Sequence, residues 1–241
     1  MLYALRQKYA GSALGALWAV AVPLVEVLAY TFVFGWLLAA GTGPGWGGYV
    51  LFVASGLLPW AALRESLEGA AALLPGHRWI RRSRIPFELL VAREVLVAHV
   101  RAAFAVVVVI AGALAAGLSI GSTWIWPVAA LLLQIVLAVG LALLLAPLGT
   151  LLPDLRPGLT SALLLLTFAS PILYMETQVG APARAWLEWN PYTHLLRLFR
   201  APLGSVDALR EVALCAAGGA ICAGAGVIFR GTLFAAARDR L

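Results

Sequence analysis

The sequence predicts an all-α integral membrane protein, formed as one transmembrane domain over residues 1–241. Of its 241 residues, 63% are hydrophobic and only 12% are charged, whereas soluble domains are about a quarter charged. The mean hydropathy is +0.95. The apolar stretches do not alternate as the strands of a membrane barrel do. Since lipid offers the backbone no hydrogen-bond partner, these stretches are predicted to be helices.

Six apolar stretches are long enough to serve as transmembrane helices, because a crossing takes roughly 20 residues. The predicted spans are 14–38, 49–70, 95–118, 124–151, 159–175 and 209–229. Ahead of them, residues 1–12 place apolar side chains on one helical face and turn Arg6 and Lys8 away. This predicts a short helix in the membrane interface, although a frayed terminus with flanking charges is the alternative.

The distribution of arginine and lysine predicts that both termini are cytoplasmic. In that orientation the cytoplasmic segments hold eleven basic residues and the outer segments three, as the positive-inside rule requires. The same rule accounts for the net charge of +6. Basic patches interleaved with aromatic residues are absent from the sequence, which argues against a nucleic-acid partner.

The cytoplasmic loop between the second and third spans has the sequence GHRWIRRSRIPFELL over residues 76–90. Four arginines lie within seven residues, and Ile85, Pro86 and Phe87 follow at once. The positive-inside rule explains the arginines but not the apolar residues around the proline. A buried aromatic anchor ringed by charges is the usual layout of a protein interface, so this loop is predicted to dock on another protein.

The outer segment 176–208 is too apolar for a plain loop and too interrupted for a span. Trp186 and Trp189 suit the membrane interface, and Asn190-Pro191 is a helix-start signal. We therefore expect two short helices around this Asn-Pro turn, re-entering the outer leaflet. Such broken helices are tolerated where they pack against protein or line a cavity.

Motifs for catalysis are lacking in the sequence. A phosphate-binding loop needs Gly-Lys-Ser/Thr, but the single lysine, Lys8, is followed by Tyr9. His99 has no partner at metal-ligand spacing and is interpreted as a packing histidine. We expect no catalytic residue, metal or cofactor on this chain, although an intramembrane enzyme stays an alternative because ionisable residues within spans often mark function.

A substrate path is suggested by Glu26 and by aromatic residues of the first two spans. Glu26 has no basic partner in its own span, so its partner lies on another helix or in a water-filled path. Tyr30 and Phe34 form a stripe, and Phe52 and Trp60 decorate the second span. These rings either stack on sugar rings or pack helices together.

Three segments, in order, resemble type-2 ABC transporter permeases that export polysaccharides. The first is RQKYAGSALGALWAVAVPLVEVLAYTFVFG, in which Tyr9, Ser12, Gly15, Trp18 and Pro23 match the motif that leads into the family's first span. The second is LRESLEGAAALLPGHRWIRRSRIPFELL, similar to the passage from the second span into the cytoplasmic loop. The third is SPILYMETQVGAPARAWLEWNPYTHLLRLFR, similar to the family's outer segment with its Asn-Pro turn.

The resemblance implies a half-transporter of the bacterial inner membrane. Two copies dock two copies of a separate ABC ATPase, which binds ATP and Mg²⁺, and export a polyprenyl-pyrophosphate-linked glycan such as O-antigen of lipopolysaccharide, teichoic acid or capsule. Export of a drug or small lipid is the alternative within this scaffold. The expected ATPase-coupling residues, in a coupling helix, are Arg78, Arg81, Arg82, Arg84, Ile85, Pro86, Phe87 and Glu88. The expected substrate residues are Arg6, Lys8 and Tyr9 at the inner interface, Glu26, Tyr30, Phe34, Phe52 and Trp60 along the path, and Tyr174, Trp189, Asn190 and Pro191 at an outer gate.

Overall fold

The computed structural model describes residues 18–37, 45–76, 86–115, 117, 121–204 and 206–238. Its α-helices are α2 (Trp18–Tyr30), α3 (Gly45–Gly76), α4 (Phe87–Ala115), α5 (Ile125–Leu151), α6 (Leu155–Ala169), α7 (Ala181–Trp189), α8 (Pro191–Phe199) and α9 (Ala208–Arg238). The shorter turns are the π-helical η2 (Thr31–Leu37) and the 3-10 turns η4 (Ser122–Trp124), η5 (Glu176–Gln178) and η6 (Ala201–Leu203). These described segments contain no strand, which confirms the all-α prediction for them.

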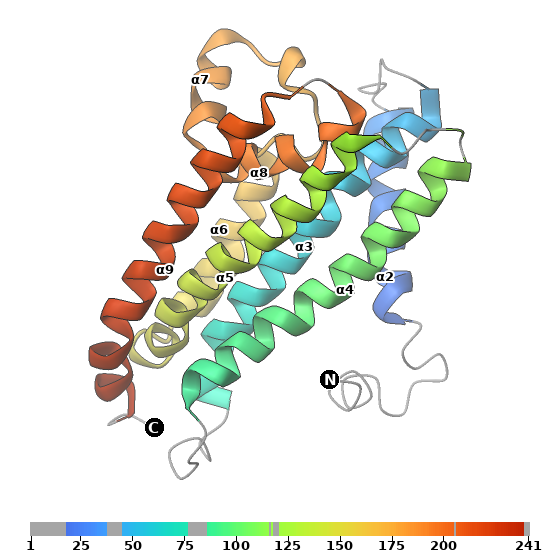
Figure 1. Ribbon diagram of the computed structural model, residues 1–241. Coiled ribbons are helices and arrows are strands. Elements are labelled where there is room, and N and C mark those ends of the chain that lie inside the picture. Colours follow the sequence, from blue (N-terminus) through green and yellow to red (C-terminus); the bar gives the residue numbers. More distant parts are fainter. Residues whose placement is uncertain are drawn as a thin grey trace.

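The long helices α3, α4, α5 and α9 lie side by side and form most of the bundle (Figure 1). Helix α4 runs in the opposite direction to α3, α5 and α9 (Figure 1). The short helices α7 and α8 lie together at the end of the bundle where α9 begins. The end of α3 and the start of α4 lie at the opposite end, on the same side as the end of α9.

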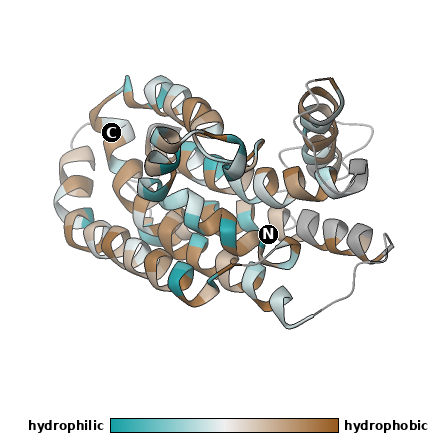
Figure 2. Cartoon of the chain, turned by 90° about the horizontal axis from the view of Figure 1, so that it is seen from above, coloured by the Kyte–Doolittle hydropathy of each residue, from teal (hydrophilic) through white to brown (hydrophobic). Residues whose placement is uncertain are grey.

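Three of the described helices are long and apolar enough to cross a membrane, namely Gly48–Leu74, Ser122–Leu151 and Ala208–Ala237. Two shorter apolar helices span Ala21–Leu37 and Leu155–Ala169. Hydrophobic residues occur all around the periphery of the bundle (Figure 2), and Leu165 and Ile221 are each 71% exposed. An apolar outer surface of this extent is typical of a chain whose solvent is lipid.

Helix α6 ends earlier than the predicted span 159–175, and a proline explains the difference. Its last residue is Ala169, and Ser170 has an extended backbone with φ −95° and ψ 149°. The residue before a proline is disfavoured in the helical region, and Pro171 follows Ser170 directly. The remaining residues up to 175 therefore form an irregular connection to the outer segment.

Helices α5 and α9 approach each other at backbone distance, because glycines face each other where they cross. A Cβ added to Gly140 on α5 would come within 2.5 Å of the Ala223 nitrogen, and one added to Gly226 on α9 within 2.6 Å of the Gly140 carbonyl oxygen. Small residues at a helix contact permit this proximity, as is usual between helices in membranes.

A buried polar network joins α3, α4 and α5 in the middle of the bundle. His99 is 1% exposed; its Nδ1 lies 2.8 Å from the Val95 carbonyl oxygen and its Nε2 lies 3.1 Å from Gln134 Nε2. Gln134 Nε2 also donates to the Pro59 carbonyl oxygen at 2.8 Å. Both ring nitrogens of His99 thus have partners, which confirms its interpretation as a packing histidine.

Candidate functional site

Most of the predicted ATPase-coupling residues lie outside the described part of the chain. These are Arg78, Arg81, Arg82, Arg84 and Ile85, and the predicted interface residues Arg6, Lys8 and Tyr9 also lie outside it. The described residues on either side are Gly76, where α3 ends, and Pro86, which precedes α4. Both are at the bundle end opposite α7 and α8 (Figure 1).

The start of α4 is fastened to the end of α9 by two contacts. The Phe87 ring stacks on Phe234 with centroids 4.3 Å apart and an interplanar angle of 5°. The Glu88 carboxylate pairs with Arg230 at 3.2 Å. Phe87 is only 5% exposed, because its ring packs against this chain's own helix. Its expected role as an anchor in an ATPase cleft stays a prediction.

The predicted path residues of the first span lie on α2 and in the π-helical turn η2. Glu26 is half-buried and has no hydrogen bond or ion pair among the described residues. Tyr30 and Phe34 have ring centroids 6.3 Å apart at an angle of 32°. Both rings are half-buried, so part of this aromatic stripe remains exposed on the surface of the chain.

The two path residues predicted on α3 contact side chains of neighbouring elements. Trp60 is 2% exposed, and its indole Nε1 donates to Thr167 Oγ1 at 2.7 Å, while its ring meets Tyr192 edge to face with centroids 4.7 Å apart. The Arg200 guanidinium lies 3.7 Å from the centroid of the Phe52 ring. These contacts agree with the alternative in which the rings pack helices together. That Phe52 and Trp60 stack on substrate stays a prediction.

At the expected outer gate, Asn190 builds the turn between α7 and α8. Its Oδ1 accepts the Tyr192 backbone N–H at 3.0 Å as a helix N-cap, and its Nδ2 donates to Ser170 Oγ at 2.9 Å. Pro191 takes the first position of α8, where its missing N–H costs nothing. The predicted pair of short helices around Asn190-Pro191 is present, and Trp189 beside the turn is 86% exposed. Tyr174, the remaining gate residue, is half-buried below this turn, and its hydroxyl lies 3.4 Å from the Ala169 carbonyl oxygen.

An ion-pair network holds these outer helices to α9. Arg197 on α8 contacts Glu176 of η5 at 2.6 Å, Glu188 of α7 at 2.5 Å and Glu211 of α9 at 3.3 Å. Glu211 is 3% exposed and also lies 2.5 Å from His194 Nδ1. One guanidinium therefore joins four elements, and we call this set the outer ion network.

Arg210 and His194 complete the outer ion network. His194 Nε2 lies 3.0 Å from the Glu188 carbonyl oxygen, so both ring nitrogens have a hydrogen-bond partner. Arg210 lies 3.4 Å from Glu188 and 3.8 Å from Glu211. Two arginines thus contact the carboxylates of the network, and the contact with Glu176 raises the pKa of Arg197. Charges taken partly out of water are tolerated when they are paired in this way.

A second, partly buried arginine binds the backbone just after the end of α6. The Arg200 guanidinium donates to the carbonyl oxygens of Pro171 at 2.5 Å and Ile172 at 2.7 Å. It also lies above the Phe52 ring, and no carboxylate pairs with it among the described residues. Carbonyl oxygens of the irregular connection that follows α6 thus receive a cationic partner.

Sequence reasoning did not identify these residues as a site. Arg197 and Arg200 are two of the three outer basic residues that the positive-inside count includes. The available signal was the spacing of Glu188, His194 and Arg197 on a segment otherwise rich in apolar residues. Ionisable residues in such a setting are rare and usually have partners, but the partner residues on η5 and α9 are remote in sequence.

We predict that acidification loosens the outer ion network through Glu188. Hydrogen bonding from Arg197, with the nearby charges of Arg197, Arg210 and His194, holds the pKa of Glu188 below its usual value of 4.5. A depressed pKa means that the stabilisation is present above pH 4.5 and is lost as the pH falls through the lower folded value. Because the side chain is 45% exposed, the effect is at most about 1 kcal/mol.

The measurement is the thermal midpoint of the purified wild type and of Glu188→Gln between pH 7 and pH 3. The midpoint of the variant should fall less than that of the wild type below pH 4.5, since glutamine does not titrate. Parallel curves for the two proteins would contradict the prediction.

Comparison with known proteins identifies relatives among exporters. No protein-family model matches the chain. An O-antigen export system permease protein RfbA of Klebsiella pneumoniae is 21% identical over 198 residues, which cover 81% of this chain and 75% of the relative. A protein of the same name from Myxococcus xanthus is 27% identical over 205 residues, covering 82% and 75%.

These relatives are permeases rather than enzymes, and the match extends over most of both chains. The aligned length exceeds what one shared motif or one apolar helix would give. The comparisons therefore confirm the resemblance seen in the sequence, to type-2 ABC transporter permeases of the O-antigen export branch.

Proposed function

We propose that this chain is the transmembrane subunit of an ATP-driven exporter in a bacterial inner membrane, which moves a lipid-linked polysaccharide from the cytoplasmic to the outer side. The observation that most supports this is the similarity to O-antigen export system permeases over about four-fifths of the chain. Two copies form the pore, and a separate pair of ABC ATPases binds ATP and Mg²⁺ and hydrolyses the nucleotide.

The proposed topology has six crossings with both termini in the cytoplasm. The crossings are α2 with η2, α3, α4, α5, α6 and α9, whose bounds are given above. The excess of arginine on the inner segments supports this orientation. In it, the outer ion network faces the outside, and α7 and α8 re-enter the outer leaflet.

The segment between α3 and α4 is proposed to receive force from the ATPase. Because Phe87 is buried against Phe234, docking relies on the preceding arginines and on Ile85. Nucleotide-driven closure of the ATPase pair then displaces the start of α4, and the bound states of the partner shift the permease between conformations.

The proposed path for the glycan begins at the inner interface, where Arg6, Lys8 and Tyr9 meet the lipid phosphates. It continues along Glu26, Tyr30 and Phe34 on the open face of α2 and η2. Weak, repeated stacking suits movement along a path, since tight sites would stall the substrate. The turn at Asn190-Pro191, with Tyr174 and Trp189, forms the outer gate.

The decisive experiment is to express the chain with its cognate ATPase and measure both ATPase co-purification and surface glycan. We expect Arg82→Glu to reduce both at least tenfold, because reversing a charge in a docking surface removes attraction and adds repulsion. The matched control is Arg184→Glu, the same charge reversal in the outer segment, which should leave co-purification unchanged. If both variants assemble and export normally, the coupling assignment fails, and if lipid-linked glycan never stimulates the ATPase, the substrate assignment fails.

A further inference from the structure

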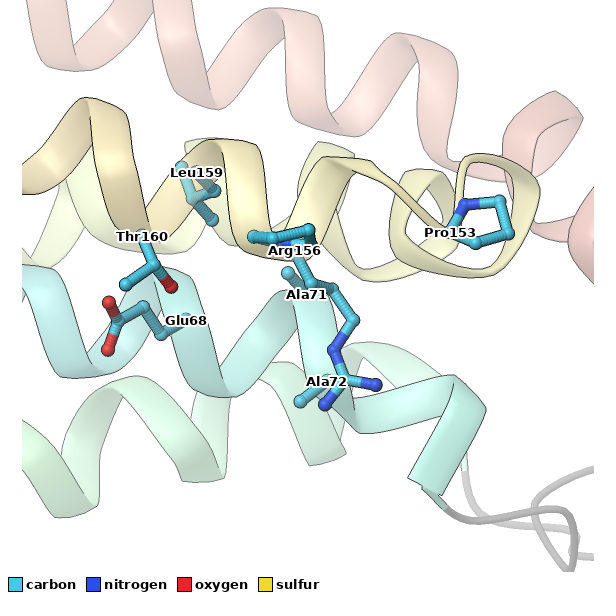
Figure 3. A pocket seen from close by; sticks show the side chains of 8 residues that line it. Glu68, Ala71, Ala72, Pro153, Arg156, Leu159 and Thr160 are labelled. Carbon is cyan, nitrogen blue, oxygen red and sulfur yellow. The ribbon is translucent and has the colours of Figure 1, made fainter.

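A pocket of about 520 Å³ lies between the end of α3 and the start of α6 (Figure 3). It is at the bundle end where α3 finishes, next to the loop that joins α5 to α6. The residues that line it are Glu68, Ala71, Ala72, Pro153, Arg156, Pro157, Leu159 and Thr160. The outer ion network and the aromatic stripe of α2 contribute none of these residues.

The pocket holds one acidic and one basic side chain that do not pair with each other. Glu68 lies on α3 below Thr160 of α6, and the Arg156 side chain extends from α6 toward Ala72 (Figure 3). Neither charge has an ion pair with a described residue. Since Glu68 and Ala72 are four residues apart, slightly more than one helical turn, ~6 Å, separates the two positions along α3.

We propose that this pocket binds the phosphate–ammonium headgroup of a phospholipid with a primary amine. The Arg156 guanidinium matches the geometry of a phosphate and can donate two hydrogen bonds to it. The Glu68 carboxylate accepts N–H donors of the ammonium group, and the Thr160 hydroxyl offers a further acceptor. A headgroup that carries both charges neutralises both side chains at once.

The composition of the pocket discriminates between headgroups. Quaternary ammonium groups are recognised by aromatic rings, and none of the described lining residues is aromatic. A choline headgroup also lacks an N–H to donate to Glu68. A purely anionic headgroup such as glycerol phosphate leaves the Glu68 carboxylate without a cation and is repelled by it.

The surroundings favour a membrane lipid over a free phosphoamine. Helix α6 continues from the pocket with exposed apolar side chains, including Leu164, Leu165 and Phe168. Acyl chains beside α6 therefore meet a hydrophobic surface. The proposal does not depend on polysaccharide export, so its outcome and that of the export experiment are separate.

The test uses the full chain in nanodiscs, with phosphatidylethanolamine, phosphatidylcholine or phosphatidylglycerol spin-labelled on the acyl chain as probes. We expect association of the ethanolamine lipid to exceed that of the other two by roughly two- to fivefold, the range of one partly exposed charged contact. Both Arg156→Gln and Glu68→Gln should remove this preference. Soluble phosphoethanolamine should compete weakly, because it lacks the acyl chains.

Matched controls are Arg93→Gln and Glu94→Gln, which remove the same charges from a neighbouring ion pair on α4 outside the pocket. They should retain the ethanolamine preference. Equal association of all three lipids in the wild type overturns the proposal. A Glu68→Gln variant that keeps the preference also overturns it, because the pocket is then only an anion site. Full competition by soluble phosphoethanolamine overturns it as well, because the ligand is then a free metabolite.

Discussion

Replacing Arg197 with methionine is expected to destabilise the protein by about 3 kcal/mol, because it takes the nearer of two guanidinium partners from the buried carboxylate of Glu211. Glu211 has a side chain only 4% exposed, whereas Glu176 and Glu188 can turn toward water. His194 and, at 3.8 Å, Arg210 still contact Glu211, so the loss is partial. The measurement is the free energy of unfolding in detergent, with limited proteolysis of the segment 176–208 as a second readout.

The control for this change is Arg184→Met in the same outer segment. Arg184 donates to the carbonyl oxygens of Val179 and Thr177 from an exposed position, so its loss should change the unfolding free energy by about 0.5 kcal/mol or less. Arg197→Lys should lie between the two, because lysine keeps the charge but lacks the planar fork. Equal effects of Arg197→Met and Arg184→Met would show that the outer ion network does not secure the outer helices.

Replacing Gly226 with alanine is expected to cost about 2 kcal/mol, because one added methyl group forces α9 away from α5. The new Cβ would lie 2.6 Å from the Gly140 carbonyl oxygen and 3.2 Å from the Leu143 Cβ. Neither atom belongs to the flexible end of a side chain, so the clash is relieved only by a shift of helices. Thermal unfolding of the purified protein measures the cost.

Gly224→Ala on the same helix is the matched control. A Cβ at Gly224 meets nothing within 4 Å, and alanine has a helix propensity up to about 1 kcal/mol better than glycine. The two substitutions, two residues apart and chemically identical, should thus act in opposite directions. If both stabilise the protein, the close approach of α5 and α9 is not a requirement of the fold.

The helices could be predicted from the sequence because lipid imposes one rule on long apolar stretches. The predicted span 124–151 agrees closely with η4 and α5. By contrast, the predicted spans 49–70 and 209–229 are shorter than α3 and α9, which continue as helix beyond their most apolar residues. Hydropathy detects the hydrocarbon core, whereas the end of a helix depends on local capping and on proline.

The residues of the candidate site were less predictable, because their roles depend on contacts across the fold. In the sequence, Trp60 and Tyr30 are both aromatic residues of a predicted span. In the fold, Trp60 is buried and donates a hydrogen bond to Thr167, 107 residues away. In the sequence, Arg197 is an isolated basic residue of the outer segment. Its partners Glu176 and Glu211 lie beside it only in the folded chain. The short local signal of Asn190-Pro191, in contrast, was sufficient to predict the turn between α7 and α8.

Helix α9 contacts different neighbours at its two ends, so it links the two ends of the bundle. Near its C-terminus Phe234 and Arg230 fasten it to the start of α4, and near its N-terminus Glu211 is bound to Arg197. With 31 residues, this helix is ~46 Å long. A displacement of the start of α4 is therefore expected to move α9 as well, and with it the buried carboxylate of Glu211 at the opposite end of the bundle.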